Sequence, residues 1–335
     1  MAEIASQQTT QNPLEPNFLM NSLHLNDHSA SAESYSAHDD VIPTIDYSML
    51  FSTDPHQASL ALQYLAQLVN HEIPDKVFEN FFKGIYEFFD PKTLEERKVY
   101  SKKDSMDRIR WGLNSSSGEN REYIKVIAHP DYNFPSNPST FSEVFQEYYK
   151  ETRRIVVGLA RAMSKSLGFE EKLIEKAFKL KSGFDVSAMN LYPPNHKSKG
   201  EMGLPEHTDP GFIITLVQDV NGGLQILSHQ GKWIQASIPR HAILIQIGDH
   251  LEILTNGKYK SHLHRVIVGK NKVQRISVAT LHGPSLETFV RPAPEFVDQD
   301  HPQAYLGMTY KQSLQVNGNH EIDVQSSLDQ IRLSI

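Results

Sequence analysis

The sequence places an imidazole and a carboxylate two positions apart, at His207 and Asp209, and a second imidazole far downstream at His264. Two imidazoles and one carboxylate form the ligand set that holds non-haem iron(II) on one face and leaves other positions open for chemistry. Arg275 and Ser277 follow soon after. Because a guanidinium can grip a carboxylate with two parallel hydrogen bonds, this pair indicates that the ligand is an acid. The five residues together predict an iron centre that works with a carboxylic acid.

Each part of this pattern also has an ordinary structural role. The run 208–211 favours a turn, and a single histidine on a strand is more often a hydrogen-bonded residue than a metal ligand. The joint spacing is more specific. The segment from His207 to His264 is long enough for a strand meander to return beside the first pair, and one hairpin can carry the chain on to Arg275. Strand alternation then points Arg275 and Ser277 to the same side.

The composition excludes several other kinds of chemistry. The 335 residues contain no cysteine, which excludes disulfides, thiolate nucleophiles and cysteine-ligated metal sites. The formal net charge of −7 argues against a nucleic-acid-binding surface, because such surfaces gather lysine and arginine. No apolar run approaches the roughly 18 residues that span a bilayer. Since no lysine or arginine precedes Lys76, a transit or signal peptide is disfavoured, and we expect a cytosolic protein. The expected partner is a small-molecule substrate. The sequence predicts no oligomeric state.

The elements that must position these residues begin with helices. Residues 1–40 are rich in Gln, Ser and Asn and predict a disordered tail, followed by an edge strand over 41–46. Apolar spacing predicts four helices, over 57–68, 75–89, 141–167 and 170–180. A capping box of Thr140 and Glu143 opens the third of them. Residues 101–138 are expected to be mostly loop, with short extended pieces.

The pattern then changes to short strands punctuated by Gly, Pro and Asn. They are expected over 186–191, 212–218, 223–227, 232–237, 242–247, 264–268 and 275–281. Helices followed by strands, without βαβ alternation, exclude a doubly wound sheet and predict an α+β fold. Its core would be a double-stranded β-helix, or jelly roll, flanked by N-terminal helices. The expected division is a helical region over 41–165, the catalytic core over 166–325 and a C-terminal tail over 326–335.

Several sequence blocks surround His207, Asp209, His264, Arg275 and Ser277. They are NLYPP at 190–194, GLPEHTDPG at 203–211, GLQIL at 223–227, IGDHLE at 247–252, YKSHLHRV at 259–266, RISVA at 275–279 and GPS at 283–285. These blocks resemble those of the plant 2-oxoglutarate- and iron(II)-dependent dioxygenases of specialised metabolism, which have the isopenicillin N synthase-like fold. The resemblance extends over nearly all of residues 41–325.

The resemblance implies a reaction as well as a fold. His207, Asp209 and His264 would ligate Fe(II), and no catalytic side chain is implied beyond this metal centre. The co-substrate 2-oxoglutarate and O₂ would take the open positions, with ascorbate in a supporting role. A small-molecule plant metabolite would be oxidised by hydroxylation, desaturation or O-demethylation, with release of succinate and CO₂.

The resemblance also implies which residues bind the co-substrate. Arg275 and Ser277 would hold the far carboxylate of 2-oxoglutarate, and Tyr192 and Asn190 would hydrogen-bond it as well. His262 would share a strand face with His264, so spacing alone could nominate either as the ligand. The family pattern places the ligand immediately before Arg-Val, which selects His264 and leaves His262 a surface or supporting role.

Other candidates carry less weight in the sequence. Four further histidines are expected to be structural: His71, His129, His250 and His282. Four aromatic residues could form a substrate wall or simply belong to the core: Trp111, Tyr123, Phe212 and Tyr310.

The chain departs from the family before Asn70. Roughly ten residues that usually close a helix and open a strand are absent there. Glu72 stands where glycine is usual, so a turn that needs positive φ would be strained. Two alternative hypotheses therefore stay open. One is a catalytically impaired jelly-roll binding protein, and the other is an ascorbate-dependent oxidase of the ethylene-forming type, which shares the Arg-x-Ser pair.

Overall fold

Two β-sheets organise the described part of the chain. The computed structural model describes residues 42–51, 66–319 and 328–333, apart from 105, 116–118, 139–140, 195–201, 221, 229 and 269–272. The larger sheet runs in the order β1 (Thr44–Asp46), β2 (Ala66–Val69), β10 (Ile243–Ile247), β7 (Ile213–Gln218), β12 (Arg275–Gly283), β5 (Phe184–Tyr192), β4 (Asn120–His129) and β3 (Ile109–Ser115). The smaller sheet runs in the order β6 (Met202–His207), β11 (His264–Ile267), β8 (Leu224–Leu227) and β9 (Trp233–Gln235).

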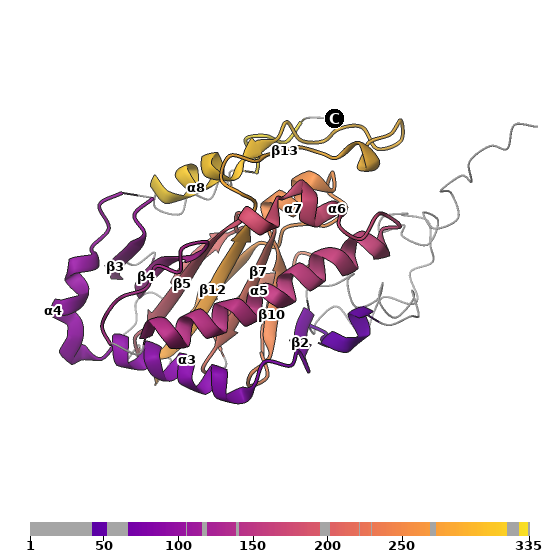
Figure 1. Cartoon of the computed structure of the whole chain (residues 1–335). Coiled ribbons are helices and arrows are strands. Elements are labelled where there is room, and N and C mark those ends of the chain that lie inside the picture. The colour runs from indigo at the N-terminus through magenta and orange to yellow at the C-terminus, as the bar shows by residue number, and fades with distance from the viewer. Residues whose placement is uncertain are drawn as a thin grey trace, which may run out of the picture. The chain divides into compact units, whose positions relative to one another are not determined.

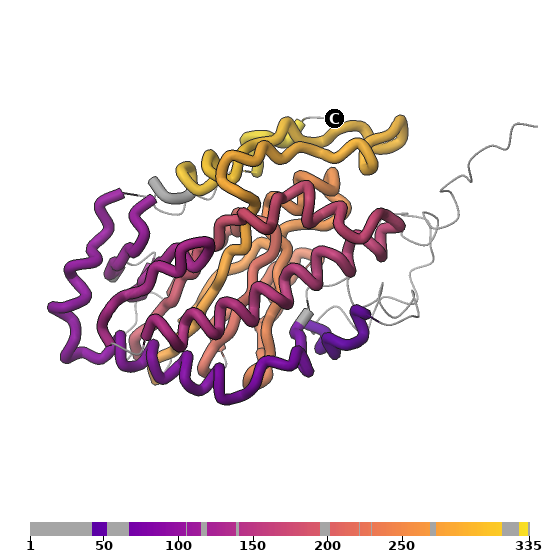
Figure 2. Tube along the Cα trace, in the orientation of Figure 1, coloured from indigo at the N-terminus to yellow at the C-terminus, as the bar shows by residue number. Residues whose placement is uncertain are grey.

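Helices cover the outer face of the larger sheet. Figures 1 and 2 show α5 (Phe141–Ser166) lying across the strands, with α3 (Asp75–Phe88) beside it. The other helices are short: α4 (Leu94–Arg97), α6 (Leu173–Ala177), α7 (Asp249–Leu254) and α8 (Tyr310–Asn319). A separate pair of short strands is formed by β13 (Phe289–Val290) and β14 (Met308–Thr309). None of the helices in the described residues has the length and apolar character needed to cross a membrane.

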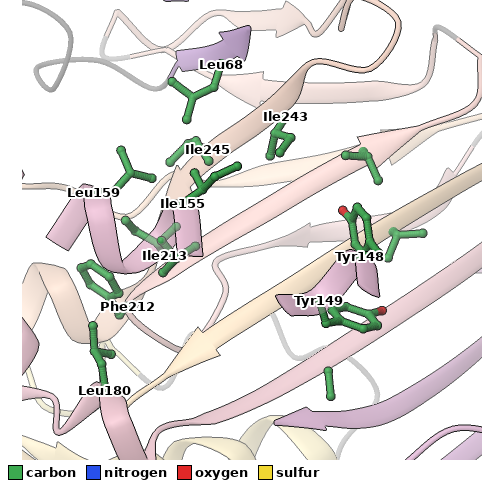
Figure 3. Packing of buried hydrophobic residues seen from close by; sticks show 14 of the residues in the cluster. Leu68, Tyr148, Tyr149, Ile155, Leu159, Leu180, Phe212, Ile213, Ile243 and Ile245 are labelled. Carbon is green, nitrogen blue, oxygen red and sulfur yellow. The ribbon is translucent and has the colours of Figure 1, made fainter. Parts of the chain in front are cut away.

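Strand alternation gives the larger sheet two different faces. On the outer face, Ile213 and Ile243 pack with Ile155 and Leu159 of α5 (Figure 3). On the inner face, a second apolar cluster joins the two sheets; it includes Leu216, Leu244, Leu224, Ile226 and Val266. Burying one such side chain contributes about 1.5–3 kcal/mol, so both faces hold the sheet in place. The α+β prediction with a jelly-roll core and flanking helices is confirmed.

Most of the expected elements are present. The helices expected over 75–89 and 141–167 are α3 and α5, although Thr140 of the expected capping box lies outside the described residues. The helix expected over 170–180 is shorter, at Leu173–Ala177. All seven expected strands are found, with ends shifted by one or two residues, and the strand expected over 41–46 is β1 at the sheet edge.

Two expectations were wrong. The C-terminal end of the helix expected over 57–68 is wrong, because residues 66–68 belong to β2. This strand pairs with β1 and with β10. Residues 57–65 lie outside the described part. The loop expected over 101–138 contains the long antiparallel hairpin of β3 and β4. Pairing with distant strands overrides local spacing in both segments.

A buried polar network fixes α5 to the outer face. The Nδ1 atom of His282 lies 3.0 Å from Oδ2 of Asp185, and Nη1 of Arg153 donates to the same oxygen at 2.5 Å. Burial alone would raise the pKa of Asp185, but His282 and Arg153 outweigh it and lower that pKa to about 2. Nε2 of His282 lies 3.1 Å from Oγ1 of Thr215. His282 therefore has the structural role expected of it.

The turn after β2 holds residues in the left-handed region. Asn70 has a φ of 53° and Glu72 a φ of 66°, as expected where glycine is usual. Residues 52–65 lie outside the described part, and the effect of the shortened stretch before Asn70 on activity stays a prediction. The strand that follows is nevertheless paired on both sides.

We expect Glu72→Gly to raise the free energy of unfolding by about 0.5–1 kcal/mol, because glycine adopts positive φ without a Cβ clash. The ion pair lost with Arg154 is 3.6 Å long and exposed, so it contributes little. Urea unfolding measures the difference. Glu87→Gly, inside α3, is the control and should lose about 1 kcal/mol. A comparable loss of unfolding free energy in Glu72→Gly would contradict the claim that the backbone at Glu72 is strained.

Candidate metal centre and co-substrate site

Strand pairing brings the two candidate histidine ligands together. His207 ends β6 and His264 begins β11, and the two residues are direct antiparallel partners whose ring centroids lie 4.3 Å apart. Asp209 completes the group: its Oδ1 lies 3.6 Å from Nε2 of His207 and its Oδ2 lies 3.4 Å from Nε2 of His264. One donor atom from each residue lies within 4.8 Å of the others, the single such group found among the described residues.

The hydrogen bonds of both imidazoles suit metal binding. Nδ1 of His207 lies 2.7 Å from the Pro205 carbonyl oxygen, and Nδ1 of His264 lies 3.1 Å from that of His262. A carbonyl can only accept, so each Nδ1 carries the proton and each Nε2 presents its lone pair. Burial, reinforced by His264, lowers the pKa of His207 to about 4, which keeps this ring neutral at pH 7. Two neutral nitrogens and one carboxylate fit Fe(II).

The loop that carries Asp209 is fixed by the start of α7. The backbone N–H of Asp249 donates to the Asp209 carbonyl at 2.9 Å, and that of His250 donates to the Gly211 carbonyl at 2.8 Å. Nδ1 of His250 accepts from the Gly211 N–H at 3.2 Å. Gly211 has a φ of 114°, and a Cβ on Gly248 would lie 2.4 Å from the Gly211 oxygen, so both positions need glycine. His250 is thus structural, as expected.

Arg275 lies on the inner face of the larger sheet as a buried cation. Its Nη1 donates to Oγ of Ser277 at 3.2 Å and its Nη2 donates to Oε1 of Gln218 at 2.8 Å. The guanidinium carbon lies 5.0 Å from the ring centroid of Tyr192. Its Nε is buried and has no hydrogen-bond partner in the described residues. Burial lowers the pKa of Arg275. The Asp219 carboxylate acts on this pKa in the opposite direction, but the side-chain contacts of the guanidinium are with neutral groups, so it could bind an anion.

The other expected co-substrate residues lie nearby. Tyr192 is the direct cross-strand partner of Arg275, and Asn190 is that of Ser277. Both Tyr192 and Asn190 are buried. Oδ1 of Asn190 accepts a hydrogen bond from Nη1 of Arg121 on β4. The structure therefore brings all four residues onto one inner face, while the role of each toward 2-oxoglutarate stays a proposal.

The four aromatic candidates lie on different faces of the larger sheet or pack beside it. Trp111 and Phe212 belong to the outer apolar cluster, so they do not line the space between the sheets. Tyr310 is fully buried and packs edge-on against His250, with ring centroids 5.2 Å apart. Tyr123 is the cross-strand partner of Asn190 and lies on the inner face.

Two further histidines can also be placed. Nε2 of His71 lies 2.8 Å from the carbonyl oxygen of His241, a structural contact. His262 offers its backbone carbonyl oxygen to His264, while the role of its side chain stays a prediction.

Sequence reasoning missed two polar residues of this face. Gln218 orients Arg275, and Arg121 contacts Asn190. Both lie far from their partners in sequence, and only the register of β7 with β12 and of β4 with β5 brings them together. A hairpin predicted over 109–129 would have placed Arg121 on a strand, and this was the one sequence signal that could have identified it.

Comparisons with known proteins agree with this geometry. A model of the 2OG-Fe(II) oxygenase superfamily matches residues 183–284. The chain is similar to 2-oxoglutarate-dependent dioxygenase 19 of Oryza sativa subsp. japonica, at 30% identity over 91% of this chain and 94% of that protein. It is also similar to 1-aminocyclopropane-1-carboxylate oxidase of Musa acuminata, at 33% identity over 81% of this chain and 95% of that protein. The crystal structure of JOX2 in complex with 2OG, Fe and JA is 27% identical, with a TM-score of 0.74 over 94% of this chain and 97% of that one.

We expect His264→Ala to abolish Fe(II) binding and His262→Ala to preserve it, because residue 262 contributes a backbone carbonyl that alanine retains. Anaerobic calorimetric titration with Fe(II) measures both. The two variants remove the same side chain two residues apart, so each controls for the other. Retained stoichiometric binding by His264→Ala, with loss in His262→Ala, would reverse the ligand assignment.

Proposed function

Since the chain belongs to the 2-oxoglutarate- and iron(II)-dependent oxygenase superfamily, we propose that His207, Asp209 and His264 hold its Fe(II). The protein is an oxidoreductase that uses Fe(II), 2-oxoglutarate and O₂. The observation that carries the assignment is the cross-strand pair of histidines whose Nε2 atoms both face the Asp209 carboxylate.

We further propose that Arg275 binds the far carboxylate of 2-oxoglutarate. Its Nε is an unused buried donor, while Ser277 and Gln218 hold the other two nitrogens of the fork. Ser277 can rotate its hydroxyl to donate to the same carboxylate, and the Tyr192 ring fixes the plane of the guanidinium. The oxygens of the incoming acid would satisfy a charge that the described residues leave without an acidic partner.

When bound, the metal and co-substrate supply an oxidant that attacks a C–H bond, with release of succinate and CO₂. The chain's own residues orient the reactants and limit the access of water. His264 and Arg275 are buried, and the Asp209 loop is tied to α7. The substrate is a small-molecule metabolite, and its position over the metal decides between hydroxylation, desaturation and O-demethylation. A cytosolic location remains a proposal based on the sequence alone.

We expect anaerobic addition of Fe(II) and 2-oxoglutarate to give a weak visible charge-transfer band that His207→Ala abolishes. The band reports a keto-acid bound to the metal, so it needs both sites at once. No band from the wild-type protein at saturating concentrations would contradict the proposed function. Turnover that proceeds without 2-oxoglutarate would instead favour an oxidase of the ethylene-forming type.

Arg275→Lys should raise the Kd for 2-oxoglutarate by about tenfold to hundredfold, because an ammonium cannot form the paired hydrogen bonds of the fork. Titration of the same visible band measures it. Arg240→Lys is the matched control, since Arg240 is exposed. An unchanged Kd in Arg275→Lys would place the co-substrate elsewhere.

A further inference from the structure

The inner face of the larger sheet continues beyond the co-substrate residues onto β4 and β3. One cross-strand row runs from Ser277 through Asn190 and Tyr123 to Gly112. The adjacent row runs from Ala279 through Ala188 and Lys125 to Arg110. The second row begins with the small side chains of Ala279 and Ala188 and ends with the two cations Lys125 and Arg110.

Strand alternation decides which way these cations point. Ile124 and Val126 flank Lys125 in sequence and belong to the outer apolar cluster against α5. Ile109 and Trp111, on either side of Arg110, pack on the same outer side. Because neighbouring residues of a strand face opposite ways, Lys125 and Arg110 face the space between the sheets.

Lys125 forms no ion pair within the described residues, and it is half-buried. Its Nζ lies 5.8 Å from the ring centroid of Tyr123, and the guanidinium carbon of Arg121 lies 4.7 Å from the same ring. Arg121 already pairs with Glu119. A half-buried ammonium beside other cations is destabilised, and a bound anion would offset that cost.

Burial and the neighbouring charges together set the pKa of the Lys125 ammonium. Burial is the main cause that lowers the pKa of Lys125 to about 7, and the charges of Arg121 and Arg110 lower it further. The Asp209 carboxylate acts in the opposite direction. Burial likewise lowers the pKa of Arg110. An anion bound here would remove the repulsion and restore the charged form of Lys125.

We propose that Lys125 and Arg110 bind the carboxylate of the substrate, so that the enzyme selects a small organic acid. The proposal rests on the proposed function, because Lys125 and Arg110 share the inner face of the larger sheet with the residues proposed to bind 2-oxoglutarate. Tyr123 is the cross-strand partner of Asn190 and its ring centroid lies 5.8 Å from Nζ of Lys125, so this ring would contact the carbon skeleton of the acid. Lys125 is thus a specificity-determining residue, distinct from Arg275, which serves the co-substrate.

The test uses the full chain loaded anaerobically with Fe(II) and 2-oxoglutarate. Cinnamate and phenylacetate are titrated beside cinnamamide and phenylacetamide, which have the same shape without the charge. We expect the acids to bind at least about tenfold tighter than the amides, and Lys125→Met to weaken the acids by about tenfold to hundredfold with little effect on the amides. Lys125→Arg should retain the preference for acids.

Controls separate this proposal from the proposed function. Lys83→Met, at an exposed position on α3, should bind the acids as the wild type does. The visible 2-oxoglutarate band should persist in Lys125→Met, which shows that this variant is folded and loaded. Loss of that band in Lys125→Met alone would assign Lys125 to the co-substrate and overturn the proposal. Equal binding of acids and amides by a wild type that shows the band, or no binding of either, would also overturn it.

Discussion

The site depends on one antiparallel contact, the pairing of β6 with β11 that sets His207 opposite His264. A slip of one residue in this register would turn one imidazole away from the other. The pairing becomes irregular just after His264, and such irregularities often re-aim side chains beside active sites. The Asp209 loop, held by the backbone of α7, then brings the carboxylate to both rings. The metal geometry thus follows from backbone hydrogen bonds more than from side-chain packing.

The two faces of the larger sheet have different roles: the outer face packs against the helices, and the inner face carries the candidate binding residues. Its outer face is buried under α3 and α5 and includes charges that neutralise one another, as Asp185 and Arg153 do. Its inner face carries Arg275 and Lys125, cations that form no ion pair within the described residues. Burying unpaired charge costs free energy, and an anionic ligand would offset that cost. We therefore infer that anionic ligands complete this inner face, with 2-oxoglutarate as one of them.

Much of this arrangement could be predicted from the sequence, and the limits have physical causes. The spacing of His207, Asp209 and His264 indicated a metal centre because strands alternate and hairpins return. Glycine preference at a turn correctly indicated positive φ at Glu72. The β3–β4 hairpin was missed because its inner positions are polar, which resembles a loop. The importance of Lys125 arises only from cross-strand register between distant segments, and no local pattern reveals it.

The most direct test of the central claim is anomalous scattering at the iron edge from crystals grown anaerobically with Fe(II) and 2-oxoglutarate. The account predicts one iron peak about 2 Å from Nε2 of His207, Nε2 of His264 and a carboxylate oxygen of Asp209. It also predicts 2-oxoglutarate density between that peak and Arg275. Iron bound at other residues, or no iron peak at saturating Fe(II), would contradict it.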